Sequence, residues 1–433
     1  MDRRHFLALL SAPAVVALLN ACSSDETSPA TSAPTGSGPP AGGAQTGAAR
    51  SELARTQADP RAAVAAGLAF NGFGRKLYRA LAADRPDGNL VFSPTSIAFA
   101  VTMAAAGARG ETQLQMLETM EVGDTDDIYR DTNSLTAELE ARNGAGVELS
   151  IANSLWGQRG LTFEQTFLDL LATEYGAGLE LVDYRAKPDA TRVAINEWVE
   201  EETKGRIPEL LAQGTITADA RLTLVNAIYM KAAWLNQFNP EATADVGFTT
   251  IDGSAKQVPA MYMSRSMRYA AGDGWQAVEL PYEGEDLVMV LIVPDAGALE
   301  AYEARINVAV AVDPMIDRPV RLTLPKFDID SSFSVGDAMQ ALGMELAFSG
   351  DADFSGITSE DELRIGAVVH QANITVDEYG TEAAAATAVI METTSAPGDE
   401  PIELVLDRPF IFAVRDRGTG AELFVGRVGD PTA

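Results

Sequence analysis

Apolar residues show helical spacing in much of the first half of the chain and the spacing of strands in much of the second half. From 62 to 83 they recur every three or four residues, which predicts an amphipathic helix. Ser93 can cap a second helix, and Pro94 suits its first turn. The run 222–233 is almost continuously apolar, which predicts a strand buried on both faces. From 248 to 293 several shorter apolar runs recur at hairpin spacing.

The remaining pattern adds short elements of both kinds, and their order indicates the fold class. We expect further helices over residues 162–175, 190–203 and 335–342 and within the acidic stretch 111–142. We expect further strands over residues 89–92, 147–156, 179–184, 320–326, 363–376, 404–414 and 421–428. Helices dominate early and strands late, so the sequence predicts an α+β fold.

The N-terminal residues are interpreted as a targeting segment. Residues 1–21 carry paired arginines before a short apolar run, which resembles a twin-arginine export signal. The end of this run, Leu19-Asn-Ala-Cys22, resembles a bacterial lipobox, so we expect cleavage before Cys22 and a lipid on its thiol. An ordinary secretory peptide with an incidental cysteine is the alternative. The sequence therefore predicts an exported, membrane-anchored lipoprotein at the cell surface or in the extracellular space.

The segment after the signal has a composition of its own. Residues 22–60 are rich in Ser, Thr, Pro, Gly and Ala, and such a segment buries too little apolar surface to fold. We interpret it as a flexible stalk. No comparable change in composition follows, so residues 61–433 are expected to form one domain.

Composition excludes several classes of partner. Among 433 residues, 62 are acidic and 32 basic, which gives a formal net charge of −30. This charge disfavours nucleic acids, heparin-like polyanions and anionic membrane surfaces, so we expect no nucleic-acid partner, no heparin-like cofactor and membrane contact only through the lipid. Cys22 is the single cysteine, so no intrachain disulfide can form. We expect a monomer without a metal or cofactor.

The sequence also argues against a hydrolase. No G-x-S-x-G, S-x-x-K or H-E-x-x-H pattern stands in a supporting context. One of only two histidines lies in the export signal. We therefore expect a protein that is not an enzyme.

The stretch 376–395 combines local preferences that contradict one another. Gly380 is a flexible joint, and the alanines 383–386 form the best helix-forming run in the chain. Valine, isoleucine and threonine residues after them favour strands instead. A short helix followed by a loop is one interpretation. The other is a tethered loop whose small side chains allow it to become a strand between existing strands.

The segment Glu378-Tyr-Gly-Thr-Glu-Ala-Ala-Ala-Ala-Thr387 resembles the hinge of the reactive-centre loop in inhibitory serpins. Further stretches resemble this family in the same order along the chain: Val91–Ile97, Thr203–Leu211, Leu224–Lys231, Leu324–Phe327, Asp407–Phe412 and Leu423–Pro431. The likeness covers nearly all of residues 62–433. It implies the serpin fold, in which helices surround three β-sheets and the reactive-centre loop is exposed and mobile.

By this resemblance, two groups of residues hold the large sheet together, one under its middle and one at its top. The first is a polar cluster whose members must satisfy one another's hydrogen bonds, made of Ser93, Ser96, Asn226 and His370. At the top, Trp234 marks the place where insertion begins, and Lys326 pairs with Glu378. The plainer interpretations are a satisfied core histidine and a surface ion pair of little energetic value.

The resemblance implies an irreversible suicide-substrate inhibitor of serine proteases, with cysteine proteases as a second class of target. The target forms a covalent acyl-enzyme with the loop, and residues 380–394 then insert into the large sheet. In the inserted strand, Thr381 would share one face with Ala383, opposite Glu382. The hinge residues are Glu378, Gly380, Thr381, Glu382, Ala383, Ala384, Ala385 and Ala386. A non-inhibitory binding module with the serpin fold on the cell surface is the alternative.

The bond that the protease attacks is expected near the end of the loop. In the family the hinge glutamate is usually the seventeenth residue before this bond, which places it at Thr394-Ser395. The loop is somewhat long, so Met391 and Thr393 are alternative positions for the reactive bond. A small residue suits elastase-like or subtilisin-like pockets. The absence of Arg and Lys between 381 and 406 argues against trypsin-like targets.

Overall fold

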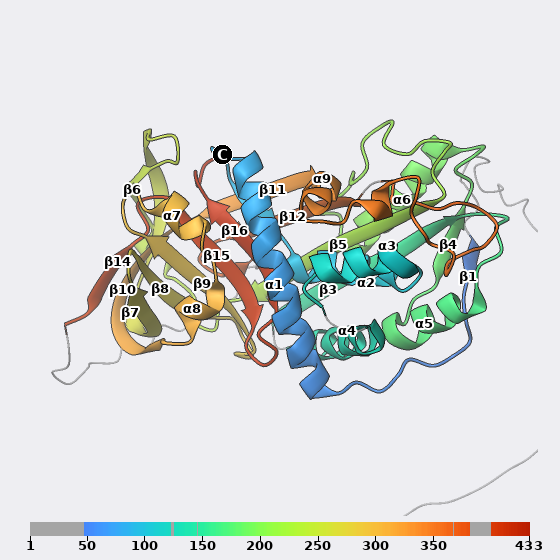
Figure 1. Cartoon of the computed structure of the whole chain (residues 1–433). Helices are drawn as coiled ribbons and strands as arrows, with labels where there is room; N and C mark the ends of the chain where they lie inside the picture. Colours follow the sequence, from blue (N-terminus) through green and yellow to red (C-terminus); the bar gives the residue numbers. More distant parts are fainter. Residues whose placement is uncertain (1–46, 123–124, 145, 367, 382–399) are drawn as a thin grey trace, which may run out of the picture. The chain divides into compact units, whose positions relative to one another are not determined.

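Two hydrogen-bonded sheets organise the part of the chain that the structure, a computed structural model, describes (Figure 1). This part comprises residues 47–122, 125–144, 146–366, 368–381 and 400–433. The first sheet has the strand order β1 (Gly47–Ala49), β4 (Leu179–Val182), β3 (Val147–Gln158), β5 (Leu222–Ala233), β13 (Gly380–Thr381), β12 (Val368–Val376) and β11 (Phe327–Ser334).

The second sheet contains the hairpin strands of the C-terminal half. Its order is β14 (Ile402–Val405), β10 (Ile316–Pro325), β7 (Ala255–Gly272), β8 (Trp275–Pro281), β9 (Leu287–Pro294), β15 (Phe410–Asp416), β16 (Glu422–Val428) and β2 (Leu90–Phe92), with β6 (Ala244–Thr249) paired to β7. The resemblance implied three sheets, whereas the described strands form two. The long strand β7 pairs with β6, β10 and β8 and so joins these strands into one sheet.

Helices pack on and between these sheets (Figure 1). The described helices are α1 (Pro60–Asp84), α2 (Pro94–Ala105), α3 (Gly110–Thr119), α4 (Thr125–Glu140), α5 (Gln165–Tyr175), α6 (Pro188–Glu202), α7 (Leu299–Glu303), α8 (Val308–Val312) and α9 (Gly336–Ala341), with 3₁₀ turns at Pro240–Ala242 and Leu346–Phe348. The expected α+β fold is thus observed.

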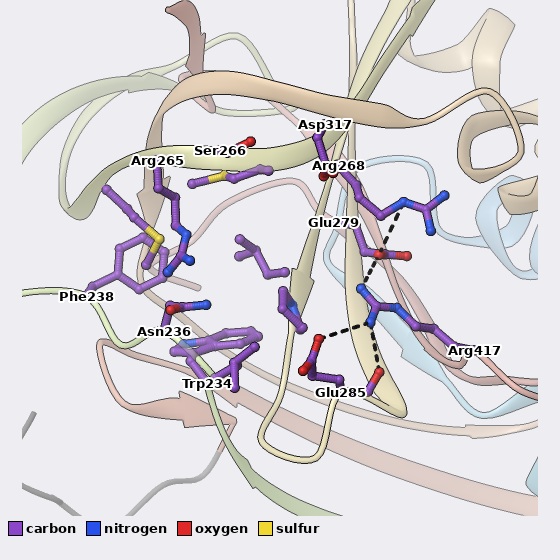
Figure 2. A pocket seen from close by; sticks show the side chains of 15 residues that line it. Trp234, Asn236, Phe238, Arg265, Ser266, Arg268, Glu279, Glu285, Asp317 and Arg417 are labelled. Atoms are coloured by element: carbon purple, nitrogen blue, oxygen red, sulfur yellow. Dashed lines mark hydrogen bonds and ion pairs between the residues drawn. The ribbon is translucent and has the colours of Figure 1, made fainter. Parts of the chain in front are cut away.

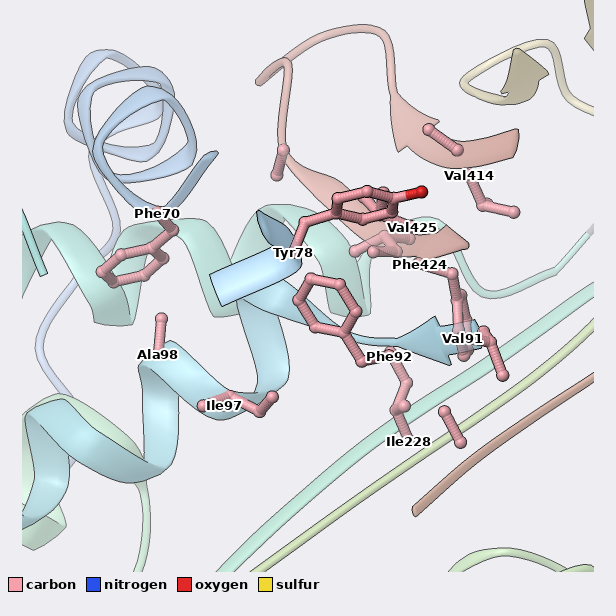
Figure 3. Close-up of a cluster of buried hydrophobic side chains, with 14 of the residues drawn as sticks. Phe70, Tyr78, Val91, Phe92, Ile97, Ala98, Ile228, Val414, Phe424 and Val425 are labelled. Carbon is pink, nitrogen blue, oxygen red and sulfur yellow. The ribbon is translucent and has the colours of Figure 1, made fainter. Parts of the chain in front are cut away.

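The helix α2 lies at the centre of the core. Its cap is the expected one, because Ser93 Oγ accepts a hydrogen bond of 3.1 Å from the Ser96 amide and Pro94 follows. All 12 residues of α2 are buried, since the helix contacts β3 and β5 of the first sheet and β16 of the second. Figure 3 shows this core, where Ile97 of α2 lies near Phe92 of β2 and Ile228 of β5.

The buried strand β5 has a different neighbour on each face, which explains its continuous apolar sequence. Leu224 and Ile228 belong to the main core with α2. Val225 and Ala227, which alternate with them, pack with residues of α6 in a second apolar cluster. Asn226 shares the α2 face and is the polar exception on it.

Some expected strands differ from the observed ones. The stretch 404–414 is two strands, β14 and β15, because Pro409 lacks an amide hydrogen for a continuous ladder. The stretch 363–376 is a strand only from Val368. The strand β11 was not predicted, since its aspartates and serines have low strand preference. Its buried Phe327 and Ile329 nevertheless alternate with more exposed residues. The short helices α7 and α8 were also missed.

The folded unit begins earlier than the expected boundary at residue 61. The strand β1, within the predicted flexible stalk, pairs antiparallel with β4 at the edge of the first sheet. Arg55 Nε donates to Asn133 Oδ1 at 2.6 Å, and the Thr56 amide donates to the Thr173 carbonyl at 2.7 Å. A strand ladder uses backbone groups, so the small side chains of Gly47–Ala49 did not prevent pairing. The predicted signal and Cys22 lie outside the described residues.

A helix that spans a bilayer must be both long and apolar. None of the described helices is both long enough and apolar enough to span a membrane.

The early start of the fold predicts different effects for two truncations. Removal of residues 1–46 should leave the thermal unfolding midpoint unchanged. Removal of residues 1–58 deletes β1 and the bonds of Arg55 and Thr56, and should destabilise the protein by about 2 kcal/mol. Calorimetry of both truncated proteins beside the full chain measures the difference. Equal midpoints for the two truncations would contradict a structural role for residues 47–58.

Candidate functional site

The first sheet contains a seam between the parallel strands β5 and β12. These strands pair directly only over residues 224–227 and 368–371. Further along, β13 lies between them and pairs antiparallel with both, through Thr381 to Ala232 and to Val376. In the described part of the chain, residues 228–231 of β5 have no strand partner on this side. We call this stretch the seam. Its lower end is the direct pairing of residues 224–227 with 368–371, and its upper end is at β13.

The lower end of the seam carries a buried polar cluster. The Ser93 amide donates to His370 Nε2 at 3.0 Å, and His370 Nδ1 lies 3.0 Å from Asn226 Oδ1. Since Nε2 accepts a hydrogen bond, the proton of the neutral imidazole is on Nδ1 and is donated to Asn226. The Asn226 amide group in turn donates to the Ser96 carbonyl at 2.6 Å and to Asn153 Oδ1 at 2.5 Å. The structure thus brings the four predicted residues together and adds Asn153.

The cluster joins the helix α2 to both strands of the seam without using a charge. His370 is fully buried, and burial lowers its pKa to about 3. It is therefore neutral at physiological pH. A neutral network of this kind can exchange hydrogen-bond partners without leaving an unpaired ion in the core.

The upper end of the seam is held by Trp234 and Tyr282. Their rings stack with centroids 4.5 Å apart at an interplanar angle of 11°. The Trp234 indole donates to the Asp377 carbonyl, and its amide donates to the Tyr379 carbonyl, each at 2.9 Å. The Tyr282 hydroxyl lies 2.6 Å from Thr381 Oγ1. These contacts fix the chain on both sides of Gly380.

An ion pair closes the same end. Lys326 Nζ lies 2.8 Å from Glu378 Oε2, and Thr243 Oγ1 donates to Glu378 Oε1 at 2.7 Å. The Glu378 side chain is only 7% exposed and that of Lys326 37%, so this pair is not the fully exposed surface pair considered above. Burial raises the pKa of Glu378, but the bonds from Lys326 and Thr243 outweigh it and hold the pKa below its usual value.

Gly380 is required by a close approach of two backbones. A Cβ atom at this position would lie 2.1 Å from the carbonyl oxygen of Ala232. The turn before it is an Asx turn, in which Asp377 Oδ1 accepts from the amides of Tyr379 at 2.8 Å and Gly380 at 3.2 Å. The glycine predicted as a flexible joint therefore allows the chain to enter the seam against β5.

Comparison with known proteins agrees with this geometry. The family described as serpin (serine protease inhibitor) matches residues 68–431. The chain belongs to the serpin family. It is 36% identical over 371 residues to the leukocyte elastase inhibitor of Sus scrofa, covering 83% of this chain and 97% of that protein.

Solved serpin structures have the same fold. The thermophilic serpin Tengpin in its native state matches with a TM-score of 0.77 at 27% identity, covering 87% of this chain and 96% of Tengpin. Human thyroxine-binding globulin in complex with thyroxine matches with a TM-score of 0.78 at 28% identity, covering 86% of this chain and 100% of that chain. The family thus includes an inhibitor named for a protease and a protein named for a small ligand.

Most of the predicted serpin loop lies outside the described residues. This applies to Glu382, Ala383, Ala384, Ala385, Ala386, Met391, Thr393, Thr394 and Ser395. Their roles remain predictions. Within the described part, Glu378, Gly380 and Thr381 lie at the top of the first sheet, beside Trp234 and Lys326.

Sequence reasoning missed several residues that complete the two ends of the serpin seam. Asn153 faces Asn226 from β3, and a polar residue on the otherwise apolar face of this strand is the only local signal that could have indicated it. Tyr282 and Thr243 carry no such signal. They reach the seam only because the second sheet packs against its top.

The buried histidine predicts a specific pH dependence of stability. His370 has a native pKa near 3 and an unfolded pKa near 6.5, so its contribution is complete above pH 6.5 and is lost as the pH falls toward 3. Within this window it should remove about 1.4 kcal/mol per pH unit. Urea unfolding of the wild type and of His370→Gln from pH 7 to pH 4 should show a flatter curve for the variant. Parallel curves would contradict a neutral buried imidazole; the other histidine, His5, is common to both proteins.

Proposed function

We propose that this serpin is an irreversible suicide-substrate inhibitor of serine proteases and not an enzyme. The observation that supports this most directly is the position of Thr381. It is 2% exposed and already lies between β5 and β12, at the point where an inserted strand would begin. The chain that follows it is the loop predicted to carry the reactive bond.

The proposed trap begins as ordinary proteolysis. The serine Oγ of the protease attacks the carbonyl carbon of Thr394, and the amide bond to Ser395 breaks. The amine of Ser395 takes the proton through the catalytic histidine of the protease, and an ester joins Thr394 to the enzyme. Hydrolysis of this ester would release the protease, so inhibition requires that insertion be faster than deacylation.

Insertion along the seam supplies the driving force in this proposal. Each new hydrogen bond to β5 or β12 contributes about 1 kcal/mol net, and burial of small apolar side chains adds to it. The Thr381 hydroxyl points to Tyr282, so residues two and four positions later would point to the same side. At these positions stand Ala383 and Ala385, which are small and uncharged.

The small residue at the expected bond favours an elastase-like or subtilisin-like target. The relative of Sus scrofa named leukocyte elastase inhibitor supports a target of this type. The non-inhibitory alternative, a binding module as the name of thyroxine-binding globulin suggests for that protein, predicts no covalent complex. We further propose export as a lipoprotein anchored through Cys22, with the monomer meeting proteases outside the cell.

The alternation of inserted residues predicts opposite outcomes for two neighbouring aspartates. Ala383→Asp would place a charge on the buried side of the new strand, so insertion should slow and the protein should become mainly a substrate. Ala384→Asp carries the same charge on the opposite side and should retain most inhibition. The yield of SDS-stable complex with pancreatic elastase or subtilisin measures both. Thr381 is unsuitable for this test, because its side chain is already buried in the native sheet.

Melting curves before and after loop cleavage serve as the control for this pair. Cleavage should raise the thermal midpoint of the wild type strongly and that of Ala383→Asp much less. If both variants trapped the protease with equal yield, the assigned face would be wrong. If cleavage did not change the wild-type midpoint, insertion itself would be excluded.

A substitution to arginine tests the position of the reactive bond. The wild type should trap elastase or subtilisin but not trypsin, because the pocket carboxylate of trypsin would remain unpaired against Thr394. Thr394→Arg should gain trapping of trypsin, measured as SDS-stable complex and as the mass of the released peptide. If trypsin cut this variant without being trapped, while the wild type still trapped elastase, the bond would lie elsewhere, with Met391→Arg and Thr393→Arg as the next variants.

A further inference from the structure

A cavity of about 410 Å³ lies beside Trp234, between the end of β5 and the strands β7 and β8 of the second sheet (Figure 2). This volume falls in the range of small-molecule sites. Its wall combines apolar side chains with charged ones, so it differs from the largely neutral cluster at the lower end of the seam.

One wall of the cavity carries an arginine on a face of β7 that otherwise bears methionines. Alternate residues of β7 share a face, and the neighbours of Arg265 on that face are Met263 and Met267. Figure 2 shows the Arg265 side chain reaching from β7 toward Asn236 and Trp234. Among the described residues its guanidinium forms no ion pair or hydrogen bond. Arg265 is exposed, so its charge is accessible to a ligand in the cavity.

The opposite wall holds a buried carboxylate with one oxygen unused. Glu279 is 2% exposed, and its Oε1 accepts from Arg417 Nη2 at 2.6 Å, with Arg268 Nε at 3.8 Å. Its Oε2 is buried without a hydrogen-bond partner in the described part of the chain. An unpaired buried acceptor is costly, so a ligand that donates a hydrogen bond there would gain affinity. Because Oε2 has almost no exposed surface, a ligand donor reaches it only when the side chains around it move.

The surfaces between these polar groups are apolar and adaptable. Met263 and Met267 have flexible, polarisable side chains that fit ligands of varied shape. Phe238 and Leu280 complete this part of the wall. A flat aromatic or branched aliphatic group would therefore be accommodated between the two polar ends.

We propose that this cavity binds a small organic anion with an apolar body. The acidic group of the ligand pairs with Arg265, its body packs on Met263, Met267 and Phe238, and a donor on it bonds to Glu279 Oε2. The site is separate from the residues that would react with a protease, so its test does not depend on inhibition.

The probe 8-anilinonaphthalene-1-sulfonate has all three features, because it combines a sulfonate, two aromatic groups and an amine hydrogen. Fluorescence titration of the full chain should show one site. Arg265→Met continues the methionine face of β7 and should weaken the binding of this probe about tenfold. Arg321→Met is the matched control, since Arg321 lies on β10, outside the cavity wall, and pairs with Glu403. It should leave the affinity unchanged, and equal effects of the two variants would overturn the proposal.

Two further measurements separate the sulfonate contact from binding elsewhere on an apolar surface. The uncharged analogue N-phenyl-1-naphthylamine should bind the wild type and Arg265→Met equally. Met263→Trp, on the cavity face of β7, should abolish binding of both probes while circular dichroism shows a native spectrum. If the analogue also lost affinity in Arg265→Met, or if Met263→Trp still bound either probe, the assigned site would be wrong.

Discussion

The strands β5 and β12 pair over four residues and then separate, and much of the structure serves to hold them in this state. Backbone groups that face an open seam lack the partners that a continuous sheet would give them. The two residues of β13 supply such partners at the top. A longer strand in the same place would supply more, which is the physical reason for proposing that the loop after Thr381 inserts there.

Different kinds of interaction hold the two ends of the seam. At the lower end the contacts are neutral hydrogen bonds in a fully buried site, centred on Asn226 and His370. Their strength is insensitive to salt and changes with pH only when the imidazole is protonated. At the upper end the pair Lys326–Glu378 includes a partly exposed ammonium group, so water and salt can weaken it. The end where the hinge enters is therefore the more adjustable one.

Sequence patterns predicted those parts of the fold that depend on local chemistry. Ser93 followed by Pro94 specified the start of α2, and the apolar run of β5 indicated burial on both faces. The contacts of Asn226 with Ser96 and His370 could be expected only from family resemblance, because these residues lie far apart in the sequence. Asn153 and Tyr282 depend on strand register and on the packing of one sheet against another, which no local spacing encodes. The strand β1 was also missed, because its ladder needs only backbone groups and no side-chain pattern marks it.

Trp234 contacts the hinge, packs against Tyr282 and lines the cavity. One flat indole stacks on Tyr282, donates a hydrogen bond to the Asp377 carbonyl and forms part of the wall of the cavity beside the second sheet. A smaller residue would lose the stacking, and phenylalanine would lose the hydrogen bond. Because the ring is 1% exposed and contacted on several sides, it cannot shift without disturbing the hinge, the second sheet or the cavity. Several contacts at the upper end of the seam thus converge on one side chain, whereas the lower end is held by a network of neutral hydrogen bonds.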